Sequence, residues 1–82
     1  MERFIKYIVA WIEKDPDPFY GELRVEAFES SELEYAKDLY KHVLEKKCHK
    51  DNPEGMFLNR ETGKMVGTEL PYWQLEHVYN RN

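Results

Sequence analysis

The sequence predicts a small single domain of the α+β class, made of a β-β-α unit, a β-hairpin and a short C-terminal element. Its 82 residues suffice for one domain (1–82) and not for two. Two early segments have the patterning of strands, and a later one has the period of a helix that packs on a core. Hydrophobic residues make up 41% of the chain, which excludes a disordered tail.

The first two segments predict a pair of antiparallel strands. Residues 4–12, FIKYIVAWI, are apolar on both faces, which is typical of a central strand. Alternation divides them into two faces, one of which carries Ile5, Tyr7, Val9 and Trp11. Residues 20–29, YGELRVEAFE, alternate between apolar and charged side chains and predict a half-buried strand. The short Pro-Asp connection between the two segments favours an antiparallel pair.

Residues 30–52 predict a helix that is stopped by Pro53. Ser31 and Glu34 fit the S-x-x-E capping box, in which each side chain satisfies a free backbone N–H group. Acids in the first turn and lysines near the end match the helix dipole. The side chains that share one face, and are expected to pack on the sheet, are Leu33, Ala36, Tyr40, Val43 and Leu44.

The rest of the chain predicts a hairpin and a terminal element. Residues 56–58 and 65–66 are short apolar runs on either side of the turn 61–64, ETGK. The segment 71–80, PYWQLEHVYN, fits either an edge strand or a helix that begins at Pro71. We expect the helix by a small margin.

The composition favours a cytoplasmic protein. Cys48 is the single cysteine, so no internal disulfide forms, which fits a reducing compartment. No run of about 18 apolar residues is present, so no membrane span is expected. The N-terminus carries acids and lacks a cleavage site of small residues, so it does not resemble a signal peptide.

Acidic residues are concentrated in one part of the chain. Residues 13–38 hold nine acids against three bases, a net charge of −6, whereas the remainder is +2. A surface of this kind attracts a basic partner protein, but it also serves solubility alone, and the sequence favours both readings equally. Tyr35 either anchors such a contact or packs within the chain, and the sequence favours packing. The expected partner-binding residues are Asp15, Asp17, Phe19, Tyr20, Glu32, Glu34, Tyr35 and Asp38.

A nucleic-acid-associated domain is the second reading. It would use the basic cluster at the end of the helix, formed by Lys46, Lys47 and Lys50. The net charge of −4 counts against it, because phosphate-binding domains usually carry a positive surplus. The helix dipole also accounts for these lysines without a ligand.

A metal- or thiol-dependent enzyme is the third reading. Four potential ligands share the solvent-facing side of the helix, namely Asp38, His42, Glu45 and His49, but they match no established ligand spacing. Cys48 and His49 are neighbours on the helix, so their side chains diverge. We therefore expect no enzymatic activity, no metal and no cofactor.

In size and character the chain resembles the small acidic α+β proteins that bacteriophages make early in infection. The features that carry the resemblance are the two-strand start FIKYIVAWI…ELRVEAF, the helix SSELEYAKDLYKHVLEKK and the tail PYWQLEHVYN. The resemblance implies a protein that binds and inhibits a host protein in the bacterial cytoplasm. Some members of this class imitate DNA charge, which the basic residues after Leu39 count against here.

Overall fold

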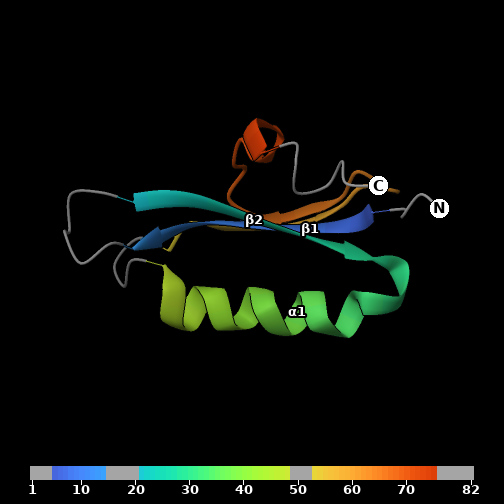
Figure 1. The fold of residues 1–82 in the computed structure, drawn as a ribbon, viewed down its shortest axis with the longest axis horizontal. Coiled ribbons are helices and arrows are strands. Elements are labelled where there is room, and N and C mark those ends of the chain that lie inside the picture. Colours follow the sequence, from blue (N-terminus) through green and yellow to red (C-terminus); the bar gives the residue numbers. More distant parts are fainter. Residues whose placement is uncertain (1–4, 15–20, 49–52, 76–82) are drawn as a thin grey trace.

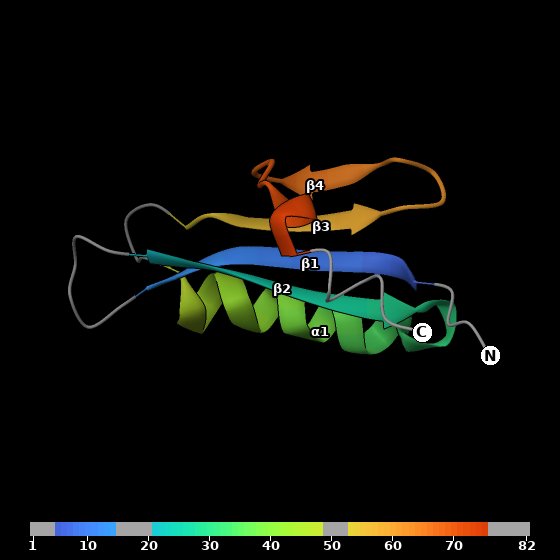
Figure 2. The ribbon, with the colours of Figure 1, turned by 45° about the horizontal axis from the view of Figure 1, so that its top comes forward.

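A four-stranded antiparallel sheet with a helix on one face forms the protein, which confirms the predicted α+β class (Figure 1). The computed structural model describes residues 5–14, 21–48 and 53–75. The strands lie in the order β2-β1-β3-β4 (Figure 2). The elements are β1 (Ile5–Lys14), β2 (Gly21–Glu29), the 3-10 turn η1 (Ser30–Glu32), α1 (Leu33–His42), the π turn η2 (Val43–Lys47), β3 (Gly55–Asn59), β4 (Met65–Gly67) and the 3-10 turn η3 (Tyr72–Leu75).

Strand β1 is central, as its two apolar faces predict. It pairs antiparallel with β2 on one side and with β3 on the other. Val9 and Ala10 are fully buried on opposite faces of the sheet. Because β2 and β3 both run antiparallel to β1, they are parallel to each other, and α1 makes the crossover between them over one face of the sheet.

The expected position of Ile5 is wrong. The sequence places it on the face of Tyr7, but it packs in the cluster on the opposite face. The register explains the difference: Ile5 lies opposite Glu29 and Tyr7 opposite Phe28, so β1 carries one extra residue there. A bulge of this kind breaks the alternation of side chains along a strand.

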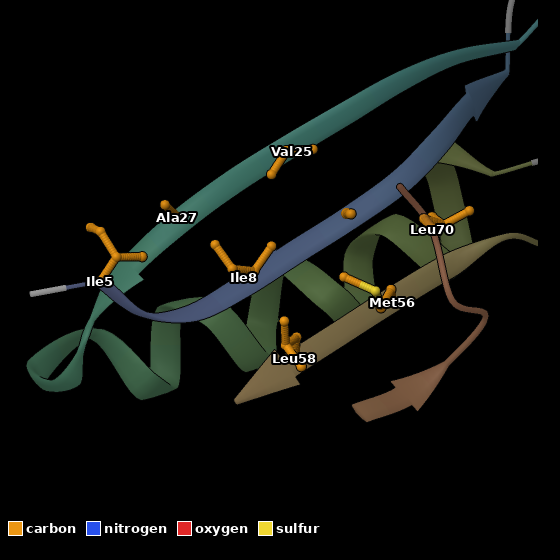
Figure 3. Packing of buried hydrophobic residues seen from close by; sticks show 8 residues of the cluster. Ile5, Ile8, Val25, Ala27, Met56, Leu58 and Leu70 are labelled. Atoms are coloured by element: carbon orange, nitrogen blue, oxygen red, sulfur yellow. The ribbon is translucent and has the colours of Figure 1, made fainter. Parts of the chain in front are cut away.

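The two faces of the sheet have separate hydrophobic clusters. The cluster under α1 consists of Tyr7, Val9, Trp11, Ala36, Val43 and Cys48. The cluster on the other face consists of Ile5, Ile8, Ala10, Val25, Ala27, Met56, Leu58 and Leu70 (Figure 3). Tyr72 of η3 packs against this second cluster, so the C-terminal element covers the face that α1 leaves open.

The core face of α1 differs in part from the expected one. Ala36 and Val43 are fully buried, and they define the centre of the buried arc. Leu39 and Tyr40 lie on either side of this centre and are partly buried. Leu44 lies about 90° away on the wheel. Its side chain packs against Gly55 of β3 but stays 38% exposed, so it lies at the edge of the core face and not within it.

The two ends of the helix also differ from the sequence prediction. The capping box is formed by Glu29 and Glu32 around η1, and not by Ser31 and Glu34. The amide of Glu29 donates to the Glu32 carboxylate at 2.9 Å. At the other end the helical segment stops at Lys47, before Pro53. It ends in the π turn η2, after which the amide of Cys48 donates to the carbonyl of Val43 at 3.0 Å.

The predicted hairpin is confirmed in strands β3 and β4. Asn59 ends the first strand and its side-chain oxygen accepts from the amides of Glu61 and Thr62, at 3.0 and 3.3 Å. Gly63 has φ +76°, in the left-handed region that glycine adopts without strain. After the hairpin, η3 confirms the helical alternative for its first turn, while residues 76–82 lie outside the described part of the chain.

Candidate functional site

The described part of the predicted acidic surface lies on helix α1. Asp15, Asp17, Phe19 and Tyr20 lie outside the described residues, so half of the predicted set has no structural account. The other half, Glu32, Glu34, Tyr35 and Asp38, lies in η1 and the first two turns of α1.

Glu34 and Asp38 are one helical turn apart and both are exposed. Neither forms an ion pair within the described residues. Tyr35 lies beside them with 70% of its surface exposed, so the packing that the sequence favours for Tyr35 is wrong. We call Glu34, Tyr35 and Asp38 the acidic helix face.

Tyr35 lies on the side of α1 that is directed to β2. Tyr40 packs against Phe57 of β3, with ring centroids 5.9 Å apart, so this flank of the helix is directed to β3. Leu39 and Tyr35 are on the opposite flank by helical geometry. The acidic helix face therefore borders the edge of the sheet at β2, where the exposed side chains of Glu22 and Glu26 point to the same side as the helix.

Glu32 has a structural role besides its charge. One oxygen of its carboxylate accepts the hydrogen bond from Glu29 that closes the capping box. A substitution at Glu32 would thus disturb the start of the helix as well as the surface charge, so Glu34 and Asp38 are the cleaner positions for testing the charge.

Acids at the far end of β2 are largely neutralised. Glu13 and Glu22 lie directly opposite each other on β1 and β2, which is unfavourable for like charges. Arg24 bridges them, with its guanidinium 3.1 Å from Glu13 and 3.2 Å from Glu22. Lys47 lies 3.6 Å from the second oxygen of Glu13. These two acids are therefore balanced by bases, whereas Glu34 and Asp38 form no ion pair with a described residue, although α1 also carries the exposed Lys37 and Lys41.

The basic cluster is only partly available to a phosphate. Lys46 is exposed, but Lys47 contacts Glu13, as described above. Lys50 lies outside the described residues. Of the three predicted lysines, Lys46 is thus the one that is described, exposed and outside an ion pair with a described residue.

Cys48 is a core residue. It is 4% exposed in the cluster under α1, and its thiol donates to the carbonyl of Glu54 at 3.3 Å. Burial raises the pKa of the Cys48 thiol, which disfavours the thiolate that a nucleophile needs. His49 lies outside the described residues, so the predicted Cys48–His49 pair has no described geometry.

The predicted metal ligands do not form a described cluster. Asp38, His42 and Glu45 lie on α1 and η2, and among the residues that the structure describes no group of three potential ligands comes together. The fourth, His49, is outside that part of the chain.

A small open cavity lies between α1 and the hairpin. It has a volume of about 250 Å³ and is lined by Lys37, Tyr40, Phe57 and Val66. It exists because β4 extends beyond the helix, which leaves Val66 58% exposed. Its lining is apolar apart from one lysine and the Tyr40 hydroxyl, so it offers shape but few polar groups for positioning a ligand.

One buried polar atom lacks a partner. The indole nitrogen of Trp11 is buried under α1 and forms no hydrogen bond with the described residues. An unsatisfied buried donor costs stability. Nothing in its surroundings points to a ligand.

The comparisons with known proteins give no match. No protein family, curated protein or solved structure is similar to this chain. In the described residues, no helix has the length and apolar character that a membrane crossing requires.

Proposed function

We propose that this protein is a non-catalytic interaction module that binds a basic surface of another protein. The observation that carries the proposal is the 70% exposed Tyr35 beside Glu34 and Asp38, two acids that form no ion pair with a described residue. Tyrosine is enriched among the residues that dominate binding energies at protein interfaces. Carboxylates around such an anchor accelerate encounter with a basic surface and exclude acidic ones.

The scaffold suits this role. Tyr35 lies on a helix that is fixed to the sheet through Ala36 and Val43, so the exposed side chain has a rigid base. A rigid anchor loses little conformational entropy on binding. The resemblance to early bacteriophage proteins leads us to propose a bacterial cytoplasmic protein as the partner and inhibition as the result of binding.

Capture from a nuclease-treated bacterial lysate tests the proposal. The bait is the wild-type chain at about 0.15 M and 0.5 M salt, a range over which screening increases strongly. We expect one stoichiometric protein that survives the nuclease and is released by salt. Loss of all binding after nuclease treatment, or capture of no protein, would contradict the proposal.

A pair of charge variants isolates the acidic helix face. Glu34→Lys with Asp38→Lys reverses two charges on this face, and we expect it to abolish capture. Glu61→Lys with Glu69→Lys makes the same change in net charge on exposed residues around the hairpin, and we expect capture to persist. Glu61 loses an exposed ion pair with Lys6, and exposed ion pairs contribute little to stability. Equal capture by both variants would mean that net charge, and not this face, drives binding.

A further inference from the structure

Among the described strands, β2 is a long edge strand. It has nine residues and stands at the end of the strand order, and no described strand pairs with its outer side (Figure 2). The opposite edge strand, β4, has only three residues. Unpaired N–H and C=O groups along an edge are a template for another strand. Strand β2 therefore offers the longer template.

The direction of its backbone groups follows from the hydrogen bonds of β1. The amide of Ile12 donates to the carbonyl of Glu54 at 3.0 Å, so even-numbered residues of β1 bond towards β3. Directions alternate along an antiparallel strand, so Trp11 and the other odd-numbered residues bond towards β2. Trp11 lies opposite Arg24, and even-numbered residues of β2 thus bond to β1. The residues whose N–H and C=O groups point outward are Leu23, Val25 and Ala27.

The side chains of β2 are self-complementary about Val25. When a second copy lies antiparallel with the two Val25 residues opposite each other, Arg24 of each copy faces Glu26 of the other. Arg24 and Glu26 then form a non-hydrogen-bonded pair of the antiparallel ladder, and in such pairs the side chains of neighbouring strands are closest. On the other face of the sheet, Leu23 comes opposite Ala27 and prolongs the apolar cluster.

We propose that two copies of the chain pair through β2, antiparallel and centred on Val25, into a dimer with one continuous sheet. Each outward N–H and C=O group of Leu23, Val25 and Ala27 then meets its complement in the second copy. Arg24 uses Nε for Glu13 and one terminal nitrogen for Glu22, which leaves the other terminal nitrogen for Glu26 of the second copy. Such a two-fold contact is closed and does not extend into a filament.

The charges and the length of β2 together select this register. Only registers that bring odd-numbered residues opposite each other satisfy the outward groups. Centring the pair on Arg24 or on Glu26 places these like charges against themselves, which is destabilising. Centring on Leu23 also pairs Arg24 with Glu22, but it overlaps only residues 21–25, whereas Val25 is the middle residue of β2 and centring there overlaps all nine residues of the strand.

The dimer does not rest on the proposed function and is compatible with it. The two-fold axis is perpendicular to the sheet, so both copies of α1 lie on the same side. The two β1 strands are three strand spacings apart, about 14 Å, and each α1 covers its own β1. Packed helices lie about 8–10 Å apart. A groove therefore remains between the helices, bordered by Tyr35 of both copies.

Sedimentation equilibrium on the purified chain tests the dimer. We expect a mass that rises with concentration towards twice the 9.9 kDa of one chain. Glu26→Arg places arginine opposite arginine and is expected to weaken dimerisation about tenfold or more. The control Glu69→Arg makes the same charge change on an exposed residue that follows β4, at the opposite edge of the sheet, and is expected to leave dimerisation unchanged.

Charge exchange between two variants gives a sharper result. Arg24→Glu alone and Glu26→Arg alone each repel their own copies. Mixed together they place arginine opposite glutamate at both positions, so the mixture is expected to regain the dimer mass. A mixture that stays monomeric, from two variants with native circular dichroism, would contradict the proposed register.

Two substitutions at Leu23 test the backbone independently of charge. Its N–H points away from β1, so Leu23→Pro removes no bond within the monomer's sheet, and edge strands tolerate proline there. Leu23→Ala loses the same side-chain contacts but keeps the N–H. We expect Leu23→Ala to dimerise and Leu23→Pro to be a folded monomer.

A monomeric wild-type chain at about 1 mM, or a dimer that survives both Leu23→Pro and Glu26→Arg, would overturn the proposal. If the wild-type chain is monomeric, the β2 edge stays available for pairing with a strand of another protein.

Discussion

Two glycines of the hairpin separate backbone strain from steric overlap. Gly63 and Gly67 both have positive φ, +76° and +90°. A Cβ atom at Gly63 would meet nothing within 4 Å. A Cβ atom at Gly67 would clash with the carbonyl oxygen of Gly55 and lie 2.6 Å from the Tyr40 hydroxyl. Alanine at these two positions therefore imposes the same kind of backbone strain, but only one of them imposes an overlap.

The expected magnitudes follow from this difference. Left-handed backbone costs a residue with a Cβ about 1–2 kcal/mol, which is the whole expected effect of Gly63→Ala. At Gly67 the neighbour is backbone of β3, which cannot rotate away as a side chain does. Overpacking adds about 1–3 kcal/mol, so Gly67→Ala is expected to cost about 2–5 kcal/mol. A domain of this size has roughly 4–12 kcal/mol of stability in total.

Urea unfolding followed by tryptophan fluorescence and circular dichroism measures both variants, because Trp11 is buried and reports on the cluster under α1. We expect Gly67→Ala to unfold at a clearly lower urea concentration than Gly63→Ala, with unchanged slopes. Equal losses of stability would refute the reasoning, since β4 would then not approach β3 as closely as the structure has it.

Three further predictions concern the cap, the turn and the thiol. Glu32→Ala is expected to lower the unfolding free energy, measured in urea, by about 0.5–2 kcal/mol, and Ser31→Ala by less than about 0.5 kcal/mol. A larger loss for Ser31→Ala than for Glu32→Ala would indicate that Ser31 and Glu34 form the capping box instead. Asn59→Ala removes two acceptor contacts in the turn and is expected to cost about 1–2 kcal/mol in the same assay, whereas no loss would show that the turn is held otherwise. Burial raises the pKa of Cys48, so the native state retains a proton that the unfolded chain releases, and stability is fully present below about pH 8.5 and falls above it. In Cys48→Ala, the unfolding free energy measured in urea is expected to fall less steeply with pH where the decline begins. An unchanged slope would contradict the claim that the Cys48 thiol causes the decline.

Much of the fold follows from local sequence patterns. The alternation in β2, the apolar faces of β1 and the hairpin turn at Gly63 each have a local physical cause, so their positions are predictable from a single sequence. The α+β class follows from the order of these elements.

The errors arise where tertiary structure decides between local alternatives. A bulge near Ile5 reverses its face, and no residue in that segment signals the bulge. The segment before α1 holds two overlapping pairs with capping spacing, and a 3-10 turn selects Glu29 over Ser31. Leu39 and Leu44 both border the helical core arc, and the position of α1 on the sheet leaves the first partly buried and the second 38% exposed.

The candidate site was predictable in composition but not in geometry. The concentration of acids identified Glu34 and Asp38, yet the exposure of Tyr35 depends on which flank of α1 contacts β3. The self-complementary edge was not predictable at all from one sequence. It requires both the strand order and the direction of the backbone groups around Val25.

The most direct test of the account is the affinity of the captured, purified partner for the wild-type chain and for Tyr35→Ala, measured at about 0.15 M and 0.5 M salt. We predict that salt weakens both complexes, and that Tyr35→Ala binds at least about tenfold more weakly at either salt concentration. Val66→Ala, an exposed apolar residue beyond the helix, serves as the control and is expected to bind as the wild type does. Equal affinities of the wild type and Tyr35→Ala, or an affinity that salt leaves unchanged, would contradict the claim that the acidic helix face is the binding surface.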